Sequence, residues 1–583
     1  MVAAATLGLA VIAWLLYGHP AEAMDDSVPF NAGDPALILW TLRWSGHALF
    51  TRHLFDAPIF WPSGNTLAFA DPLVAPAPVQ RAIDFVLPGG PLVAFNVLII
   101  STLVGNVWAT FLLARRVLVD SRAAAFAALA FSFSAMTLGW VGHPQLLPVG
   151  LFAVAFHLLL RLLDEARLRF GVWFAVVVSA TFSTSLYHGA ILAFCAGAMA
   201  VVWLAARRFR LPRATWRTLI VSAAITGALL APIVWPYVKA KRDLNLSRPL
   251  VPAFGLNPRD LLTPLPNSTW YSWLDAHASN PSSEHTYFPG LLPTLLGCVG
   301  VVALALLALR QYRMRPLNAS TITSNVDALG AGAGVLHADD PRGGPRVNEL
   351  GLLAVAGAVS FVLSLGSEVH GVSMPFAFVH DHVPGFDGIR VASRLVAPAM
   401  LVGALFAGLG LRSLLDRLTS ARLGYVLSAV ACVIVLLEFQ APTPRGKIDE
   451  SDATLAVYRE LKHEPAGAVI ELPMGDPRLG GGDWAYTETP RMLYATIDWK
   501  PRLNGYSGYW PATYLDDIDV SRTFPGPASL DRLRERHVRY VVLHTAGTGA
   551  MLPATAAAIV AALPSTVTAA PFGSSWLIDL ERH

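Results

Sequence analysis

Long apolar stretches constrain this chain more than any other feature. A helix needs about 20 mostly apolar residues to cross the hydrocarbon core of a membrane. Charged residues make up only 14% of the 583 residues, whereas a soluble globular protein carries roughly 25%. We therefore predict an α-helical polytopic membrane protein of about eleven spans and exclude a simple soluble protein. The spans are expected at residues 2–17, 91–114, 123–141, 145–163, 170–186, 189–206, 217–236, 287–309, 349–366, 391–411 and 423–440.

Arginine clusters between the spans set the predicted orientation. Cytoplasmic loops carry an excess of Lys and Arg, and following the eleven spans in order places five clusters on one side. These clusters are Arg115, Arg116 and Arg122; Arg161, Arg167 and Arg169; Arg207, Arg208, Arg210, Arg213 and Arg217; Arg310, Arg313 and Arg315; and Arg412, Arg417 and Arg422. We expect this side to be cytoplasmic, with the N-terminus inside and the C-terminal residues outside the cytoplasmic (inner) membrane. The opposite side carries one further basic cluster, Lys239, Lys241 and Arg242. Either these residues bind an anion there, or the number of spans is locally wrong.

Composition divides the chain into two predicted domains. Residues 1–440 form a transmembrane domain with long outer loops at 18–90 and 237–286, and residues 441–583 have the composition of a soluble domain. Three strand-like runs alternate there with helical patterns, which is typical of a small α/β domain. The strands are expected at 468–472, 538–543 and 574–578, and the helices at 453–462, 529–536 and 554–563.

Several function classes are excluded by what the sequence lacks. The balance of 43 Lys and Arg against 40 Asp and Glu gives no basic footprint for nucleic acid. There is no P-loop, no H-E-x-x-H and no G-x-S-x-G motif. Cys195, Cys298 and Cys432 each lie within an apolar stretch, so they form no disulfide or zinc framework. Ala21-Glu22-Ala23 resembles a signal-peptidase site, but no basic residue precedes it, and we expect the first span to be uncleaved.

Asp34 is the first candidate for a chemical role on the outer face. It lies in Gly33-Asp34-Pro35, a pattern that predicts an N-cap followed by Pro at the first position of a helix. Leu37, Trp40, Trp44 and Ala48 would form one apolar stripe of that helix, which predicts that it lies in the membrane interface. A carboxylate held at this depth could also act as a general base.

Further polar residues are predicted on the same face. Asp71-Pro72 repeats the acidic signature, so Asp71 is either a helix cap or a second acid that shares a metal or a positioning role. His143 follows the third span, and Tyr187 and His188 form the turn between the fifth and sixth, so these three residues are candidates for contact with the substrate or its lipid phosphate. Glu284 and His285 precede the eighth span and could bind a metal or orient a phosphate. The alternative to a functional role for each of these residues is an ordinary position in a loop or in the polar and aromatic belt at the membrane interface.

Arg390 and Arg394 form a candidate anion site. They are four residues apart, which predicts that they share one helix face. They lie at the outer N-terminus of a span, where the helix dipole and free N–H groups favour an anion. Positive charge on this side runs against the inside bias, so the pair is interpreted as a phosphate or diphosphate clamp. The alternative is two arginines that snorkel among lipid headgroups.

Taken in order, these features resemble the GT-C superfamily of polytopic glycosyltransferases. The similarity is to bacterial members of the mannosyltransferase or arabinose-transferase type with a distal soluble domain. Each motif is short, and their order and topology carry the resemblance over most of the chain. The motifs are Gly33-Asp34-Pro35, Phe60-Trp61-Pro62 with Asp71, Pro384-Gly385-Phe386 through Arg394, Glu471-Leu472-Pro473, and Asn504-Gly505-Tyr506-Ser507-Gly508-Tyr509.

The resemblance implies a glycosyltransferase that moves a sugar from a polyprenyl-phosphate donor to a lipid, glycan or protein acceptor of the cell envelope. Asp34 would deprotonate the acceptor with inversion at the anomeric carbon, and Arg390 and Arg394 would hold the leaving lipid phosphate. Asp71, His188, Glu284 and His285 would shape the sugar pocket or bind a divalent cation such as Mg²⁺ or Mn²⁺. Metal dependence varies across the superfamily, and the sequence identifies no ligand set.

Two other functions are compatible with the same sequence. One is a non-catalytic lipid-binding or assembly protein of the GT-C fold, because a fold alone does not define a function. The other is a transporter of lipid-linked glycans, which the low polar content within the spans and the lack of an inverted repeat disfavour. The sequence does not specify the sugar, the acceptor, the polyprenyl length, the oligomeric state or a role for the loop 310–348.

Overall fold

The protein is largely helical, as predicted. The computed structural model describes residues 2–17, 24–244, 251–277, 285–313, 344–480 and 482–581. Within these residues, nine helical segments are long and apolar enough to cross a membrane, and the shorter apolar helices α1 and α8 add two more. The predicted class, a polytopic helical membrane protein with a small C-terminal α/β domain, is therefore confirmed.

The membrane helices follow the predicted spans closely. They are α1 (Val2–Tyr17), α4 (Gly90–Leu118), α5 (Ser121–Ser132), α6 (Ala135–Gly139), α7 (Gly150–Glu165), α8 (Leu168–Thr184), α9 (Leu186–Ala206), α10 (Arg213–Leu244), α11 (Leu291–Arg313), α13 (Val347–Ser364), α15 (Ala397–Leu415) and α16 (Ala421–Glu438). Short 3₁₀ turns extend or connect them: η2 (Thr66–Phe69), η3 (Trp140–Gly142), η4 (Pro144–Leu146), η5 (Pro252–Phe254), η6 (Pro258–Leu262), η7 (Ser272–His277), η10 (Phe386–Gly388), η11 (Ala392–Val396) and η12 (Ala495–Ile497). A small hairpin of β2 (Glu368–Val369) and β3 (Val372–Ser373) precedes α14 (Pro375–His382).

Glycines allow α11 and α15 to pack with their backbones in close contact. A Cβ atom at Gly300 would overlap the carbonyl oxygen of Phe406, and one at Gly410 would overlap that of Leu296. Small residues at such crossings are favoured in membranes because lipid tails leave no hydrophobic force to hold helices together, so close packing must do it. The crossing fixes α15, whose N-terminal extension carries Arg394.

Ion pairs connect several helices at one end of the bundle. Arg116 contacts Glu349 at 2.6 Å and Asp164 at 3.4 Å, and Arg346 contacts Glu349 at 3.0 Å. These contacts join the ends of α4, α7 and α13, three of the ends that the arginine clusters placed on one side. We call this the basic end of the bundle. The side of the cell membrane that it faces remains a prediction.

The C-terminal part contains a four-stranded sheet. Its strand order is β5-β6-β8-β7, with β5 parallel to β6 and the other neighbours antiparallel. The expected strands and helices are present, and the edge strand β7 and helices α18 and α19 are additional. The elements are β4 (Arg445–Lys447), α17 (Asp452–His463), β5 (Ala468–Leu472), α18 (Asp483–Tyr494), α19 (Ala512–Ser521), α20 (Pro527–Glu535), β6 (Val538–His544), α21 (Pro553–Ala561), β7 (Thr568–Phe572) and β8 (Ser575–Asp579).

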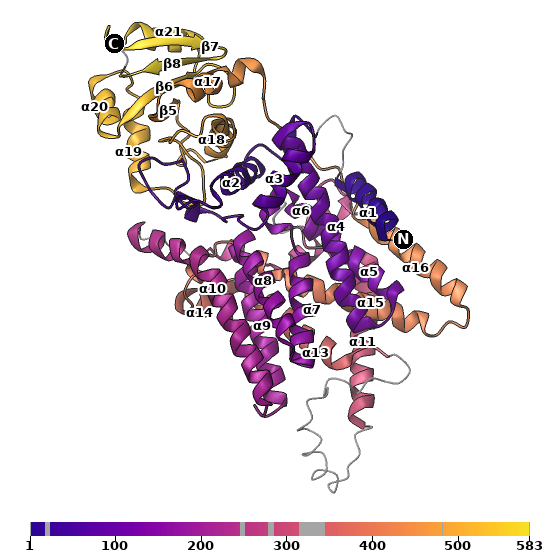
Figure 1. Cartoon of the computed structure of the whole chain (residues 1–583). Coiled ribbons are helices and arrows are strands. Elements are labelled where there is room, and N and C mark those ends of the chain that lie inside the picture. Colours follow the sequence, from indigo (N-terminus) through magenta and orange to yellow (C-terminus); the bar gives the residue numbers. More distant parts are fainter. Residues whose placement is uncertain are drawn as a thin grey trace.

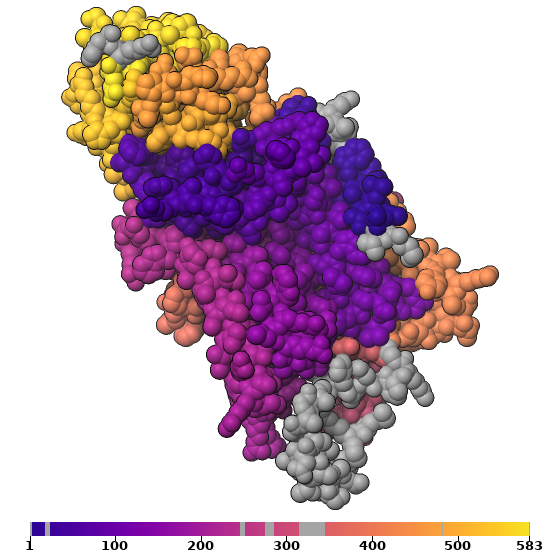
Figure 2. All heavy atoms as spheres, in the orientation of Figure 1, coloured from indigo at the N-terminus to yellow at the C-terminus, as the bar shows by residue number. Residues whose placement is uncertain are grey.

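A layer formed by the first outer loop joins the two parts. It contains β1 (Ser27–Pro29), α2 (Asp34–Ala48) and α3 (Ala77–Val86), and β1 pairs with β4. In Figure 1 the C-terminal part rests on α2 at one end of the molecule, and Figure 2 shows the same indigo layer between it and the bundle. We call this end the domain end.

Helix α2 is buried on both sides, with 12 of its 15 residues buried. The expectation that its Leu37, Trp40, Trp44 and Ala48 stripe lies in the membrane interface is wrong. That stripe packs into the core of the C-terminal part with Ile470, Leu472 and Met492. The opposite face, with Ile38 and Leu39, packs into the core of the helical bundle. The stripe was recognised correctly, but the surface that covers it is protein.

Candidate active site

Asp34 lies at the junction of the outer loop, the bundle and the C-terminal part. Its carboxylate Oδ2 is 3.1 Å from Nε2 of His143, and its Oδ1 accepts a hydrogen bond of 2.9 Å from the hydroxyl of Tyr506. The side chain is 37% exposed, so the carboxylate remains open to a ligand. Gly33, not Asp34, is the N-cap of α2, and no side-chain hydrogen bond caps the helix. The N-cap prediction is therefore wrong, and the carboxylate is directed at other elements.

The surroundings of Asp34 favour its ionised form. Burial raises the pKa of the carboxyl group, but hydrogen bonds from His143 and Tyr506 and the charge of Arg394 outweigh burial and lower it overall. Hydrogen bonds to the charged form always act in this direction. A carboxylate offers about four lone-pair positions, so two contacts leave room for a hydroxyl donor. Asp34 is thus an ionised, partly open acceptor.

His143 is positioned by the turn between η3 and η4, after the third predicted span. The preceding Gly142 lies against Phe30, because a Cβ atom there would be 3.1 Å from the Phe30 ring. A larger residue at 142 would displace this turn or the N-terminal segment. The structure therefore brings His143 to Asp34, two residues that the sequence suggested separately.

Tyr506 was not among the predicted site residues. It comes from the C-terminal part, on the loop between η12 and α19, where Trp484 of α18 supports it. The two rings are 4.8 Å apart at 70°, and Trp484 Nε1 donates to the carbonyl of Gly505 at 2.8 Å. The motif Asn504 to Tyr509 contributed to the family resemblance, but nothing in the sequence related it to Asp34.

Tyr187 gathers the two predicted clamp arginines. Its hydroxyl accepts the backbone N–H of Arg390 at 3.1 Å, and the guanidinium carbon of Arg394 lies 5.3 Å from its ring centroid. Arg390 is exposed and lies 5.3 Å above Phe254, whereas Arg394 is only 7% exposed. Arg390 precedes the 3₁₀ turn η11 and is not helical, so the shared α-helix face is wrong. The two residues are still neighbours through Tyr187.

Asp71 holds the start of the helix that carries Tyr187. Its Oδ1 accepts the backbone N–H of Leu186, the first residue of α9, at 2.8 Å. Burial raises the pKa of Asp71 to about 6, opposed by this hydrogen bond and by the charge of Arg394. Asp34 and Asp71 thus lie within the electrostatic reach of one arginine, and their pKa values are shifted in opposite directions.

The remaining predicted residues are less accessible. His188 is 2% exposed and packs against Trp140 and Phe152, with ring centroids at 5.6 and 4.9 Å. Glu284 lies outside the described residues. His285 is buried, and its Nδ1 is 3.0 Å from Asp260 Oδ2. Its pairing is therefore with an acid of the second outer loop.

Two further contacts border the arginines. The hydroxyl of Tyr287 lies 3.2 Å from Oγ of Ser393, next to Arg394. Lys241, from the cluster that disagreed with the predicted orientation, pairs with Asp387 on the turn that precedes Arg390. Lys241 is thus a neighbour of the turn that leads to Arg390.

A divalent cation finds no complete ligand set among the described residues. No group of three or more His, Cys, Asp or Glu side chains gathers in that part of the chain. Asp34 and His143 provide two potential ligands, fewer than the set that a cation needs.

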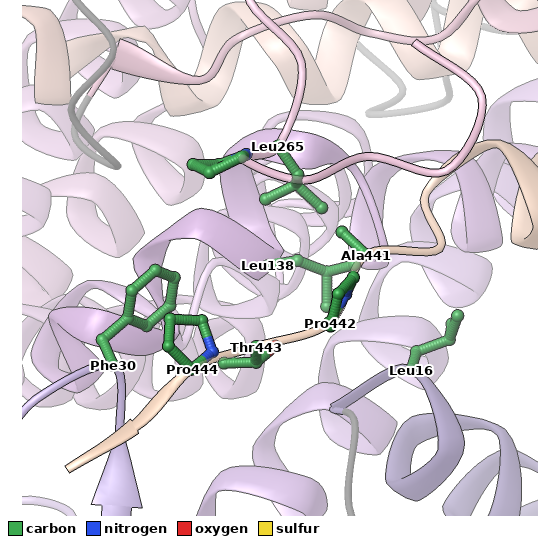
Figure 3. A pocket seen from close by; sticks show the side chains of 9 residues that line it. Leu16, Phe30, Leu138, Leu265, Ala441, Pro442, Thr443 and Pro444 are labelled. Atoms are coloured by element: carbon green, nitrogen blue, oxygen red, sulfur yellow. The ribbon is translucent and has the colours of Figure 1, made fainter. Parts of the chain in front are cut away.

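An apolar pocket next to the site is shown in Figure 3. Phe30, which packs on Gly142, also lines this pocket. None of Asp34, His143 and Tyr506 lines it. The lining residues are Leu16, Phe30, Leu138, Leu265, Pro266, Ala441, Pro442, Thr443 and Pro444.

Comparison with known proteins places the fold. No protein-family profile and no curated protein matches the sequence. The arabinofuranosyltransferase AftD from Mycobacteria matches in structure with a TM-score of 0.57 at 14% identity, over 99% of this chain and 40% of that one. The chain thus spans about two fifths of AftD.

Two other solved structures are similar at TM-scores below 0.5. They are the Archaeoglobus fulgidus oligosaccharyltransferase in complex with Zn and sulfate (0.47, 13% identity, 92% of this chain and 67% of that one) and ArnT from Cupriavidus metallidurans bound to undecaprenyl phosphate (0.44, 13% identity, 99% and 97%). The chain has the fold of the GT-C glycosyltransferases, which confirms the resemblance at the level of the fold.

Proposed function

We propose that the protein is a membrane glycosyltransferase that transfers a sugar from a polyprenyl-phosphate donor to an acceptor hydroxyl at the outer face of the cytoplasmic membrane. The observation that carries the proposal is the ionised, partly exposed carboxylate of Asp34 between His143 and Tyr506. The GT-C fold gives independent support, because it is shared with an arabinofuranosyltransferase.

Asp34 would act as the general base. The acceptor hydroxyl would donate its hydrogen bond to the open side of the carboxylate and pass its proton there as its oxygen bonds to the anomeric carbon. His143 and Tyr506 keep the carboxylate oriented. This orientation matters more than basicity alone, because a general base must lie within hydrogen-bond reach of the proton that it takes. Direct attack by the acceptor would invert the anomeric configuration.

Arg390 and Arg394 would stabilise the leaving group. As the bond from the anomeric carbon to the phosphate oxygen breaks, the polyprenyl phosphate gains negative charge. Fixed cations directed at developing charge lower the barrier because they need no reorganisation. Arg394 is buried against Tyr187, so its charge is held in place, while the exposed Arg390 is free to meet a phosphate.

Sugar transfer by the purified full-length protein in lipid nanodiscs tests the proposal. A panel of radiolabelled polyprenyl-phosphate hexoses and pentoses is incubated with membrane glycolipid and polysaccharide fractions, with and without EDTA. We expect transfer from at least one donor, and the EDTA lanes report whether a divalent cation is required.

Lipid-phosphate binding is measured in parallel. Arg390→Gln should weaken binding of undecaprenyl phosphate. Arg259 is also an exposed arginine, in the second outer loop, and Arg259→Gln should not weaken it. Absence of transfer from every donor, together with binding that is indifferent to Arg390, would contradict the proposed function.

A further inference from the structure

Aromatic side chains of the C-terminal part gather near Tyr506, which hydrogen-bonds Asp34. We call Tyr486, Tyr506, Tyr509 and Trp510 the aromatic rim. Tyr486 and Trp510 are 36% and 38% exposed, and the other two are half-buried. Aromatic rings that gather at one place on a surface are candidates for an interaction site. Tyr506 orients the proposed base through its hydroxyl, but the proposed function assigns no role to the rings of Tyr486 and Trp510.

The rim is built on one buried residue. Trp484 packs edge-on against Tyr506 at 4.8 Å and against Trp510 at 5.0 Å. Its Nε1 donates to the carbonyl of Gly505 and to the hydroxyl of Tyr514. The rings of Tyr506 and Trp510 are thereby held rigidly before any ligand arrives.

The rim extends from Asp34 toward the arginines. Tyr506 hydrogen-bonds Asp34 directly, and the ring of Tyr486 lies over Gly33, 3.4 Å from where a Cβ atom would be. At the other side, the hydroxyl of Tyr509 is 4.0 Å from the Cβ position of Gly388, on the turn before Arg390. The rim therefore borders the space between the proposed base and the proposed clamp.

We infer that the aromatic rim binds a sugar ring of the acceptor, which makes the acceptor a glycan. A sugar ring has apolar C–H faces and a polar edge, and rigid Tyr and Trp rings offer a flat apolar surface with a polar tip to match. This inference rests on the proposed function, because it assigns the acceptor side of that same site.

The position of the rim favours the acceptor over the donor. A displacement at the anomeric carbon requires the attacking hydroxyl opposite the departing phosphate. The phosphate departs toward the arginines at the ends of the membrane helices, so the hydroxyl must reach Asp34 from the side of the C-terminal part. Tyr506 and Trp510 line that side and hold a glycan so that one hydroxyl reaches the carboxylate.

Saturation-transfer NMR on the full-length protein in nanodiscs tests the inference without a donor. The probes are soluble α- and β-linked hexose and pentose oligosaccharides, with short peptides and a sugar-free phospholipid as alternatives. We expect transfer to ring C–H protons of at least one oligosaccharide. Trp510→Ala should weaken oligosaccharide binding about tenfold. Tyr486→Ala should weaken this binding less, and with Trp510→Phe the binding should be largely restored.

The matched control is Trp216→Ala, because Trp216 is also 38% exposed but lies near the start of α10, about 30 Å along that helix from Tyr237. It should leave oligosaccharide binding unchanged. In transfer assays Trp510→Ala should raise the acceptor KM about tenfold and leave the donor KM unaltered.

Two outcomes overturn the inference: no oligosaccharide binds the wild type, or binding survives both Trp510→Ala and Tyr486→Ala. Binding of peptide alone would likewise reject a glycan acceptor. If the binding depends on Trp510 but no donor supports transfer, the proposed catalysis fails while the glycan site remains. The failure of one is thus distinguishable from the failure of the other.

Discussion

Asp34 and Tyr506 lie 472 positions apart in the sequence, and their side chains are 2.9 Å apart in space. This contact couples the ionisation of the proposed base to the C-terminal part. Burial and the negative charge of Asp34 in turn raise the pKa of Tyr506 above its ordinary value, so Tyr506 remains a hydrogen-bond donor at neutral pH. The two hydrogen bonds that help to lower the pKa of Asp34 therefore come from two different parts of the fold.

Tyr506→Phe removes this hydrogen bond and retains the ring on Trp484. Because the lost bond stabilised the ionised form, the pKa of Asp34 should rise. The acid limb of kcat/KM should move up by roughly one pH unit, with little change in thermal stability. Tyr312→Phe, an exposed tyrosine near the basic end, is the control. An unmoved acid limb would show that Tyr506 does not tune the base.

Asp71→Asn tests the buried acid. The pKa of Asp71 is about 6 in the fold, against 3.8 for an ordinary aspartate. Between these values the folded chain binds a proton that the unfolded chain has released, so the stability of the wild type falls as the pH rises through this window. The Tm of the wild type relative to the variant should therefore decrease from pH 4 to 7. A constant difference would contradict the raised pKa.

The sequence indicated most residues of the site but few of their contacts. Asp34, His143, Tyr187 and Arg394 are polar residues that the sequence predicts at the outer face, and the structure brings them together. Their pairings could not be predicted, because each contact joins separate elements and depends on the helix packing. Tyr506 was not predicted as a site residue, because its motif lies in a segment whose composition is typical of a soluble domain.

At the scale of elements, α2 shows that a correctly recognised apolar stripe can lead to a wrong prediction of what covers it. Its apolar stripe matches an interfacial helix, yet the stripe packs on the C-terminal part and the opposite face on the bundle. Amphipathic spacing identifies a buried face but not what buries it. The edge strand β7 was not predicted for a different reason. Its sequence contains Ala and Pro and has no alternating β-branched residues.

Gly410→Ala should weaken the α11–α15 crossing. A Cβ atom there would overlap the carbonyl oxygen of Leu296, so the helices must separate. Overpacking of this kind costs about 1–3 kcal/mol and should lower the Tm in detergent. Because α15 continues from η11, binding of undecaprenyl phosphate should weaken as well.

Gly403→Ala is the matched control on the same helix. A Cβ atom at Gly403 would contact nothing within 4 Å, and alanine is the better helix former by about 0.5–1 kcal/mol. This variant should be as stable as the wild type or slightly more so. Equal losses in both variants would show that general helix effects, not the close crossing, determine the stability.

At the scale of the whole molecule, the C-terminal part is positioned as a component of the site. It contributes Tyr506, it covers α2, and its strand β4 pairs with β1 of the first outer loop. The hydropathy pattern predicted the helical architecture well, because membrane spans are encoded locally. It did not predict the packing of the C-terminal part on α2, which depends on the complementarity of two surfaces distant in sequence.

Cysteine labelling tests the predicted orientation. In a background with Cys195, Cys298 and Cys432 replaced by alanine, Ala546→Cys and Arg210→Cys place exposed thiols at the domain end and the basic end. A membrane-impermeant maleimide should label Ala546→Cys in intact spheroplasts and Arg210→Cys only after lysis. The opposite pattern would place the site in the cytoplasm.

The most direct test of the central claim is the rate of sugar transfer by Asp34→Asn, compared with wild type and Asp26→Asn. Asp26 lies on the same loop and is 44% exposed, close to the 37% of Asp34. We predict that Asp34→Asn folds, inserts and binds undecaprenyl phosphate but transfers sugar about 10²–10⁴-fold more slowly, while Asp26→Asn remains active. Full transfer by Asp34→Asn would contradict its role as the base.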